Sequence, residues 1–91
     1  AQIRALQIEA DSRQATRKAT QKFRDERDKL ELEKKILQVR IHHAQGDEKQ
    51  KLLDTLHQNE QALDKNKLEE SVWRAKEELE LKDALYKELR K

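Results

Sequence analysis

The chain contains no cysteine, no proline and no methionine, and it has only one glycine. Without cysteine it can form neither disulfide bonds nor thiolate metal sites, and its redox compartment stays undetermined. A single glycine excludes a glycine-rich phosphate-binding loop. Phenylalanine, tryptophan and tyrosine occur once each, which leaves too little apolar material for an ordinary globular core. These absences argue against a disulfide-bonded, nucleotide-binding or conventional globular domain.

Charged residues dominate what is present. They make up 44% of the 91 residues, against 34% hydrophobic residues, a balance that is typical of a long helix or a coiled coil. Good helix formers fill almost every window, which disfavours disorder. The 21 basic and 19 acidic residues give a net charge of +2, as expected for a solvated helix surface. No apolar stretch approaches the length of a membrane span. We expect a cytoplasmic segment of a longer protein.

Apolar residues recur at helical spacing in both halves of the chain and correspond to each other across the middle. Reading outward from Gly46, Leu37 corresponds to Leu56 and Leu30 corresponds to Leu63. Such a mirror pattern predicts an antiparallel pair of helices that turns at the glycine. The predicted coiled-coil seam consists of Ile8, Ala15, Ala19, Phe23, Leu30, Leu37, Ile41, Leu52, Leu56, Leu63, Val72, Ala75, Leu79 and Tyr86.

The centre of the chain carries signals for a helix end and a helix start. Gly46 suits a left-handed residue after a helix, because it has no Cβ. Asp47 is predicted to cap the next helix, with Gln50 completing a capping box. The predicted elements of this all-α antiparallel hairpin are a helix over 1–45, a turn at 46–47 and a helix over 48–91. Dimerisation into a four-helix bundle and a continuous helix in a parallel coiled-coil dimer stay open as alternatives.

Opposite charges also correspond across the proposed turn. Lys29 is predicted opposite Asp64, and Asp11 opposite Lys82. The segment 13–24 has five basic residues and no acidic one, and its mirror segment is rich in glutamate. This pairing of charges disfavours one possible function, the binding of nucleic acid or of an acidic membrane. That function would use Arg13, Arg17, Lys18, Lys22 and Arg24.

Polar residues interrupt the predicted seam near its middle. Glu26 is expected close to Asn66, a kind of pair that lowers stability and fixes the register of two helices. In the second half, the apolar row steps from Leu63 to Leu68, and this discontinuity predicts a local change of twist.

No group of residues predicts catalysis or ligand binding. His42 and His43 are adjacent, so they point in different directions and do not form the spacing of a helical zinc site. Paired carboxylates such as Glu69 and Glu70 belong to a solvated face. Neither serine has a base at a plausible spacing. We therefore expect no enzyme activity, no metal and no cofactor.

Several apolar residues lie outside the seam and predict a contact with a protein partner. Leu32, Ile36 and Val39 fall on the opposite side of the first helix, with Leu53 across from Val39, and Trp73 stands apart from the main row. These five residues are the predicted partner contacts.

The predicted function is a non-enzymatic coiled-coil scaffold that self-associates, as a dimer, and binds another protein. In outline, the hairpin is similar to the helical fingers of Rho effectors, of type III secretion stalk proteins and of synthetase arms. That resemblance implies a cytoskeletal, trafficking or small-GTPase partner, and it transfers no residue role. The alternative function is that of a spacer, a rod segment within a long parallel dimer.

Overall fold

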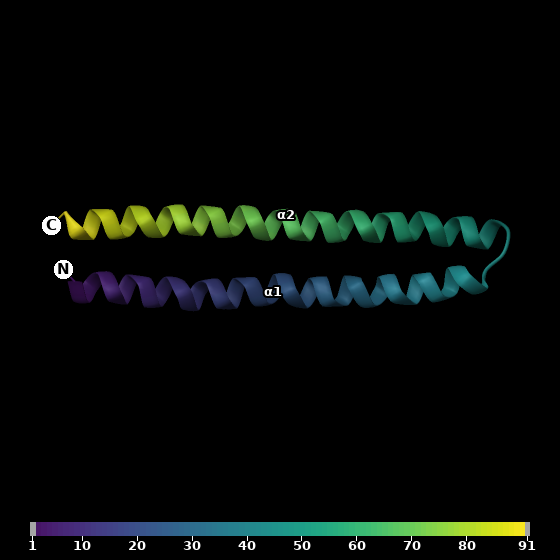
Figure 1. The fold of residues 1–91 in the computed structure, drawn as a ribbon, viewed down its shortest axis with the longest axis horizontal. Helices are drawn as coiled ribbons and strands as arrows, with labels where there is room; N and C mark the ends of the chain where they lie inside the picture. Colours follow the sequence, from purple (N-terminus) through teal and green to yellow (C-terminus); the bar gives the residue numbers. More distant parts are fainter. Residues whose placement is uncertain (1, 91) are drawn as a thin grey trace. The chain divides into compact units, whose positions relative to one another are not determined.

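The chain forms two long helices joined by a short link. The computed structural model describes residues 2–90 and contains α1 over Gln2–His43 and α2 over Asp47–Leu89 (Figure 1). Residues 44–46 connect the helices, and the described range contains no strand. The prediction of an all-α, two-helix hairpin is confirmed, and the alternative of one continuous helix is wrong. The predicted limits Ala1 and Lys91 lie outside the described residues.

The hairpin divides into two compact units. The turn unit comprises Phe23–Leu68, and the end unit comprises Ala1–Lys22 together with Glu69–Lys91. Each unit therefore pairs one segment of α1 with one segment of α2.

Gly46 provides the reversal after α1. Its φ of 63° lies in the left-handed region, which costs other residues about 1–2 kcal/mol because of their Cβ atom. A Cβ at this position would meet no atom within 4 Å. Backbone conformation, and not lack of space, therefore explains why glycine occupies the link. Ala44 N donates to Ile41 O at 3.2 Å, which tightens the last turn before the link.

The start of α2 differs from the prediction. Gly46 O accepts the first helical hydrogen bond, from Gln50 N at 3.3 Å, so Gly46 occupies the capping position and Asp47 is already helical. The predicted capping box is wrong, because the Gln50 side chain donates from Nε2 to Asp54 Oδ1 at 3.1 Å. Asp47 and Glu48 instead contribute negative charge to the first turn, where the helix dipole favours it.

In the turn unit, the two helices face each other along rows of residues spaced alternately by three and four. This spacing keeps one face of each helix toward the other. Leu63, with 6% of its surface exposed, is the one buried hydrophobic residue in the described range. All seam residues predicted for this unit lie in these inward rows. The rows are Phe23, Arg27, Leu30, Lys34, Leu37 and Ile41 on α1, and Leu52, Leu56, Asn59, Leu63 and Asn66 on α2.

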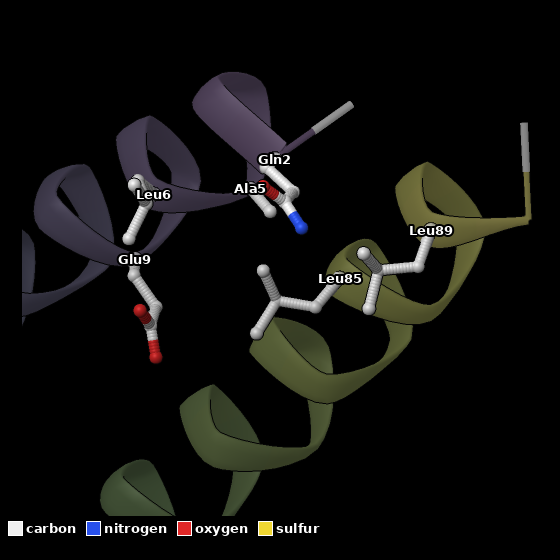
Figure 2. Close-up of a pocket in the computed structure, with 6 residues that line it drawn as sticks. All are labelled: Gln2, Ala5, Leu6, Glu9, Leu85 and Leu89. Atoms are coloured by element: carbon white, nitrogen blue, oxygen red, sulfur yellow. The ribbon is translucent and has the colours of Figure 1, made fainter.

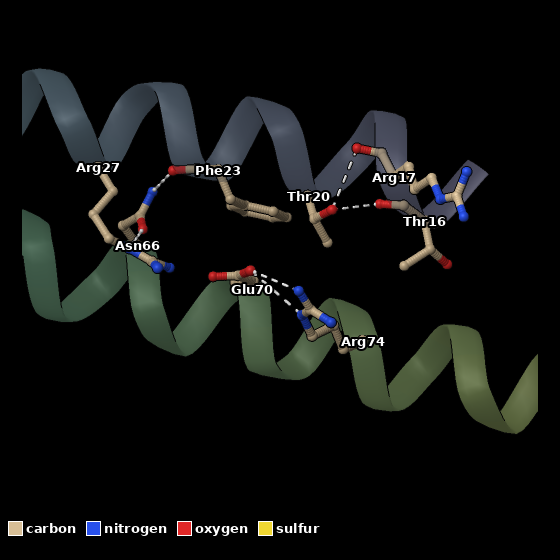
Figure 3. Close-up of polar contacts among 8 residues, drawn as sticks. All are labelled: Thr16, Arg17, Thr20, Phe23, Arg27, Asn66, Glu70 and Arg74. Carbon is tan, nitrogen blue, oxygen red and sulfur yellow. Dashed lines mark hydrogen bonds and ion pairs between the residues drawn. The ribbon is translucent and has the colours of Figure 1, made fainter. Parts of the chain in front are cut away.

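Asn66 links the two helices of the turn unit through its side-chain amide. Its Nδ2 donates to Phe23 O at 3.1 Å, and its Oδ1 accepts from Arg27 Nε at 3.0 Å (Figure 3). The same Nδ2 lies 3.5 Å from Glu26 Oε2, the neighbour that the sequence predicted. Because these bonds form only when Asn66 lies level with Phe23, they fix the register of the helices.

Asn59 makes a similar link nearer the turn. Its Nδ2 donates to Leu30 O at 2.9 Å. Its Oδ1 is buried and has no hydrogen-bond partner, although a buried unsatisfied acceptor costs about 1–3 kcal/mol. Asn59 therefore contributes to register while it lowers the stability of the turn unit.

In the end unit, the facing rows contain more polar residues. Thr20 is 4% exposed and donates from its hydroxyl to Thr16 O at 2.7 Å and to Arg17 O at 3.3 Å. Glu70 is 9% exposed, and its Oε1 accepts from Nε and Nη2 of Arg74, each at 3.3 Å (Figure 3). These bonds run within one helix and do not join the two helices. The inward residues are Ala5, Ile8, Glu9, Ser12, Thr16, Ala19 and Thr20 on α1, and Glu70, Trp73, Glu77, Leu81, Ala84, Leu85 and Glu88 on α2.

Five residues predicted for the seam lie outside it. Val72, Leu79 and Tyr86 are 59%, 70% and 61% exposed, and Ala15 and Ala75 are exposed as well. The seam prediction is therefore wrong for these positions, whereas Ile8 and Ala19 are half-buried in the inward row of the end unit.

The side of α2 that turns toward α1 explains why Val72, Leu79 and Tyr86 lie outside the seam. The helix continues its spacing of three and four beyond Asn66, which brings Glu70 and Trp73 inward. The predicted step from Leu63 to Leu68 does not occur, and Leu68 is 64% exposed. Trp73 is consequently half-buried in the inward row and does not share a face with the exposed residues predicted to contact a partner.

Candidate interaction surfaces

Half of the large apolar side chains in the described range are exposed. In the described range, eleven large hydrophobic residues are exposed and only Leu63 is buried among the hydrophobic residues. Contiguous exposed apolar residues usually mark interaction sites. The eleven residues are Ile3, Leu6, Leu32, Ile36, Val39, Leu53, Leu68, Val72, Leu79, Tyr86 and Leu89.

The first surface is the turn-end face, which consists of Leu32, Ile36 and Val39 on α1. These residues are 60%, 46% and 61% exposed, and their spacing places them on one side of the helix, opposite the inward row. Leu53 on α2 is 40% exposed and directly follows the inward residue Leu52, so it flanks the seam. The structure therefore leaves these four predicted partner contacts accessible.

The second surface is the α2 outer row, which was predicted as part of the intramolecular seam. Val72, Leu79 and Tyr86 recur every seven residues, with Ala75, Lys82 and Leu89 between them. Val72, Leu79 and Tyr86 lie opposite Glu70, because they differ from it by about half a helical turn, whereas Leu89 also lines the cleft at the ends of the helices. The sequence does contain the signal for this row, namely its heptad spacing.

Exposed ion pairs flank the α2 outer row. Lys82 Nζ lies 3.3 Å from Glu78 Oε1, and Lys87 Nζ lies 3.0 Å from Asp83 Oδ2. Both pairs join residues four apart on α2, whereas the sequence predicted Lys82 opposite Asp11. Exposed pairs of this kind contribute roughly 0–1 kcal/mol, so they leave the charged groups available to a partner.

Tyr86 is covered on one side by an arginine. Arg90 lies over the ring, with Cζ 4.3 Å from its centroid, and Nη2 donates to the Tyr86 hydroxyl at 3.2 Å. A guanidinium over an aromatic face is a favourable cation–π arrangement. The contact orients the ring while 61% of Tyr86 stays exposed.

The ends of the two helices enclose an open apolar cleft. Its volume is about 420 Å³, and it is lined by Leu6, Leu85 and Leu89 together with Gln2, Ala5 and Glu9 (Figure 2). Ile3 lies nearby in the sequence and is 84% exposed. The cleft contains few polar groups that could orient a small molecule, and it therefore fits apolar contact better than specific ligand binding.

The histidines near the turn form no metal site. The rings of His42 and His43 meet edge to face, with centroids 5.3 Å apart and an interplanar angle of 81°. They line an open cleft of about 620 Å³ beside Val39. In the part of the chain that the structure describes, no group of three or more histidine, cysteine, aspartate or glutamate residues could hold a metal ion.

Arg13, the first residue of the basic segment, lies beside acidic residues in the end unit. Arg13 lines a cleft of about 360 Å³ together with Glu77, Glu78 and Arg74. Acidic and basic side chains therefore lie side by side at this cleft, whereas nucleic-acid binding uses a basic patch on one face.

Neither helix offers a segment for crossing a bilayer: within residues 2–90, no helical stretch is both long and apolar enough.

Comparison with known proteins gives no relative, since no family model, no curated protein and no solved structure matches this chain.

Proposed function

We propose that this chain is a non-enzymatic coiled-coil element that self-associates and acts as a protein scaffold. The observation that carries the proposal is the placement of its apolar residues, because in the described range eleven large hydrophobic side chains are exposed, ten are half-buried and only one is buried. Covering such residues in an assembly releases about 25 cal/mol for each Å² of apolar surface. A second copy of the same chain is always available to cover them.

The inward contacts support the same proposal. Apart from Leu63, the buried residues of the described range are polar, namely Thr20, Asn59, Asn66 and Glu70. Buried polar groups fix the register of helices more than they add stability. The inward contacts therefore define how the hairpin folds, while the outward apolar residues are free to stabilise an assembly.

The turn-end face stays the predicted contact for a further protein. Leu32, Ile36 and Val39 follow the spacing of one helix face, which fits the docking of a partner helix. A cytoskeletal, trafficking or small-GTPase partner is part of this prediction.

The proposal is tested by the mass of the chain in solution as a function of concentration. Sedimentation equilibrium from low micromolar to millimolar concentration should show a transition from one chain to two, and the midpoint of thermal unfolding should rise with concentration. A mass of one chain throughout this range, with an unfolding midpoint that does not depend on concentration, would contradict self-association.

A further inference from the structure

The α2 outer row has the pattern of a coiled-coil seam, but within its own unit only its last member, Leu89, borders a cleft with residues of α1. It follows the heptad spacing from Val72 to Leu89, and Val72, Leu79 and Tyr86 are each at least 59% exposed. The side of α2 that faces α1 is less regular, because Glu70, Glu77 and Glu88 interrupt its apolar residues Trp73, Leu81, Ala84 and Leu85. A helix with its more regular apolar row facing solvent is expected to pair with another helix.

We propose that two copies of this chain form an antiparallel dimer in which their α2 outer rows pack against each other. The proposal rests on the self-association proposed above and adds the surface, the occupant and the orientation. A twofold axis midway between Leu79 and Lys82 relates the copies, so each residue of the row contacts a different residue of the other copy.

Side-chain sizes in the row complement each other in this arrangement. Val72 of one copy lies opposite Leu89 of the other, and the small Ala75 lies opposite the large Tyr86. Leu79 lies opposite Lys82, whose aliphatic stem covers it while the ammonium group stays near Glu78, its partner at 3.3 Å. Large residues opposite small ones allow two helices to approach closely without overlap.

The flanking charges favour the antiparallel orientation with a second copy. In an antiparallel pair, Glu69 lies opposite Arg90 of the other copy, and Lys76 opposite Asp83 of the other copy, so each dimer contains four contacts between opposite charges. A parallel pair would place Glu78 beside Asp83 of the other copy, which is a contact between like charges. The flanking charges therefore favour an antiparallel pair of α2 outer rows over a parallel pair.

Cysteine cross-linking tests the orientation, because the chain has no cysteine of its own. Two variants of the full chain, Val72→Cys and Leu89→Cys, are oxidised separately and as a mixture. The antiparallel dimer predicts disulfide-linked pairs that contain one chain of each variant, formed mainly in the mixture. A parallel dimer would instead link each variant to itself. Self-linking of this kind, or no cross-link in a chain that sediments as a dimer, would overturn the proposal.

A matched pair of substitutions tests the surface. Leu79→Glu should raise the dissociation constant of the dimer by at least about 100-fold, because the dimer contains the substitution twice at its centre. Leu32→Glu makes the same change at a leucine of similar exposure, 60% against 70%, on the turn-end face. It should leave the dissociation constant within about 3-fold of the original chain. Circular dichroism checks that both variants keep their helix content.

The outcomes separate this proposal from the broader one. If the original chain is a dimer that Leu32→Glu dissociates and Leu79→Glu does not, self-association stands and the α2 outer row is the wrong surface. If the original chain stays a monomer at millimolar concentration, both proposals are wrong. Dissociation by Leu79→Glu alone, with mixed cross-links between Val72→Cys and Leu89→Cys, supports both.

Discussion

The turn unit and the end unit use the same two helices in opposite ways. In the turn unit, α1 and α2 direct leucines toward each other, and Leu63 is buried between them. In the end unit, α2 directs Glu70 toward α1 and leaves Leu79 70% exposed. The comparison shows that heptad spacing determines which residues share a face of a helix, but not which face meets the neighbouring helix.

The two units also differ in what their buried polar groups do. Asn66 bonds from one helix to the other at Phe23 O, so it fixes register. Thr20 bonds to Thr16 O on its own helix, and such a bond adds nothing to register. The turn unit is therefore defined by specific contacts between helices, whereas the buried polar groups of the end unit bond within their own helix.

The largest loss of stability is expected from a substitution at Leu63, the buried hydrophobic residue of the turn unit. Leu63→Ala should lower the free energy of unfolding by about 2–4 kcal/mol, because it removes buried methyl groups and leaves a cavity. Leu79→Ala, measured on dilute chain, should change it by less than about 0.5 kcal/mol, since Leu79 is 70% exposed. Urea denaturation followed by circular dichroism measures both. Equal losses for the two variants would contradict the contrast between the units.

Asn66→Ala should have the next largest effect. The substitution removes the bond to Phe23 O and leaves Arg27 Nε without the acceptor that it contacts at 3.0 Å. A loss of about 1–3 kcal/mol in the free energy of unfolding follows. Thr20→Ala in the end unit is the control and should cost less than half as much, because the bonds it removes run within α1. A Thr20→Ala loss as large as that of Asn66→Ala would count against the register role of Asn66.

Gly46→Ala tests the link of the turn unit. The φ of 63° should make alanine destabilising by about 1–2 kcal/mol, since no neighbouring atom would add a clash. Gly46→Asn should cost less, because asparagine tolerates the left-handed region better than alanine does. Thermal unfolding of the two variants gives the comparison, and an alanine variant as stable as the original chain would show that the link does not require this conformation.

The substitution with the smallest expected effect should raise the stability of the hairpin and not lower it. Asn59→Leu should raise the free energy of unfolding by about 1 kcal/mol, because it removes a buried oxygen without a partner and adds apolar surface to the inward row. Leu30 O keeps its role in the helix after the change. Denaturant unfolding of dilute chain measures the gain, and a loss of stability in this variant would show that the bond from Asn59 Nδ2 to Leu30 O outweighs the unsatisfied oxygen.

The sequence predicted the turn unit well because two independent signals agree there. Gly46 is the only glycine, and leucines such as Leu37 and Leu56 correspond around it, so the glycine and the spacing together predicted the hairpin and the apolar members of its inward rows. The bonds from Asn59 and Asn66 to backbone oxygens could not be foreseen, because backbone acceptors carry no sequence signal.

The end unit was predicted less well because α2 carries two heptad rows. One row contains Val72, Leu79 and Tyr86, and the other contains Glu70 and Trp73. Hydrophobicity favours the first row, so the sequence predicts that row as the seam. The structure selects the second because it continues the phase that is set in the turn unit. Only the phase of the whole helix, and not the composition of either row, distinguishes the two.

The most direct test of this account measures which side of α2 faces α1 in the end unit. Spin labels are placed at Ser12 and Glu77, which line the same cleft, and in a second sample at Ser12 and Leu79. Each labelled chain is diluted with excess unlabelled chain, so that pulsed electron resonance reports distances within one molecule. The account predicts a shorter distance for Ser12 and Glu77, by up to about one helix diameter of 10 Å. A shorter distance for Ser12 and Leu79 would mean that the apolar row faces α1 and would contradict the account.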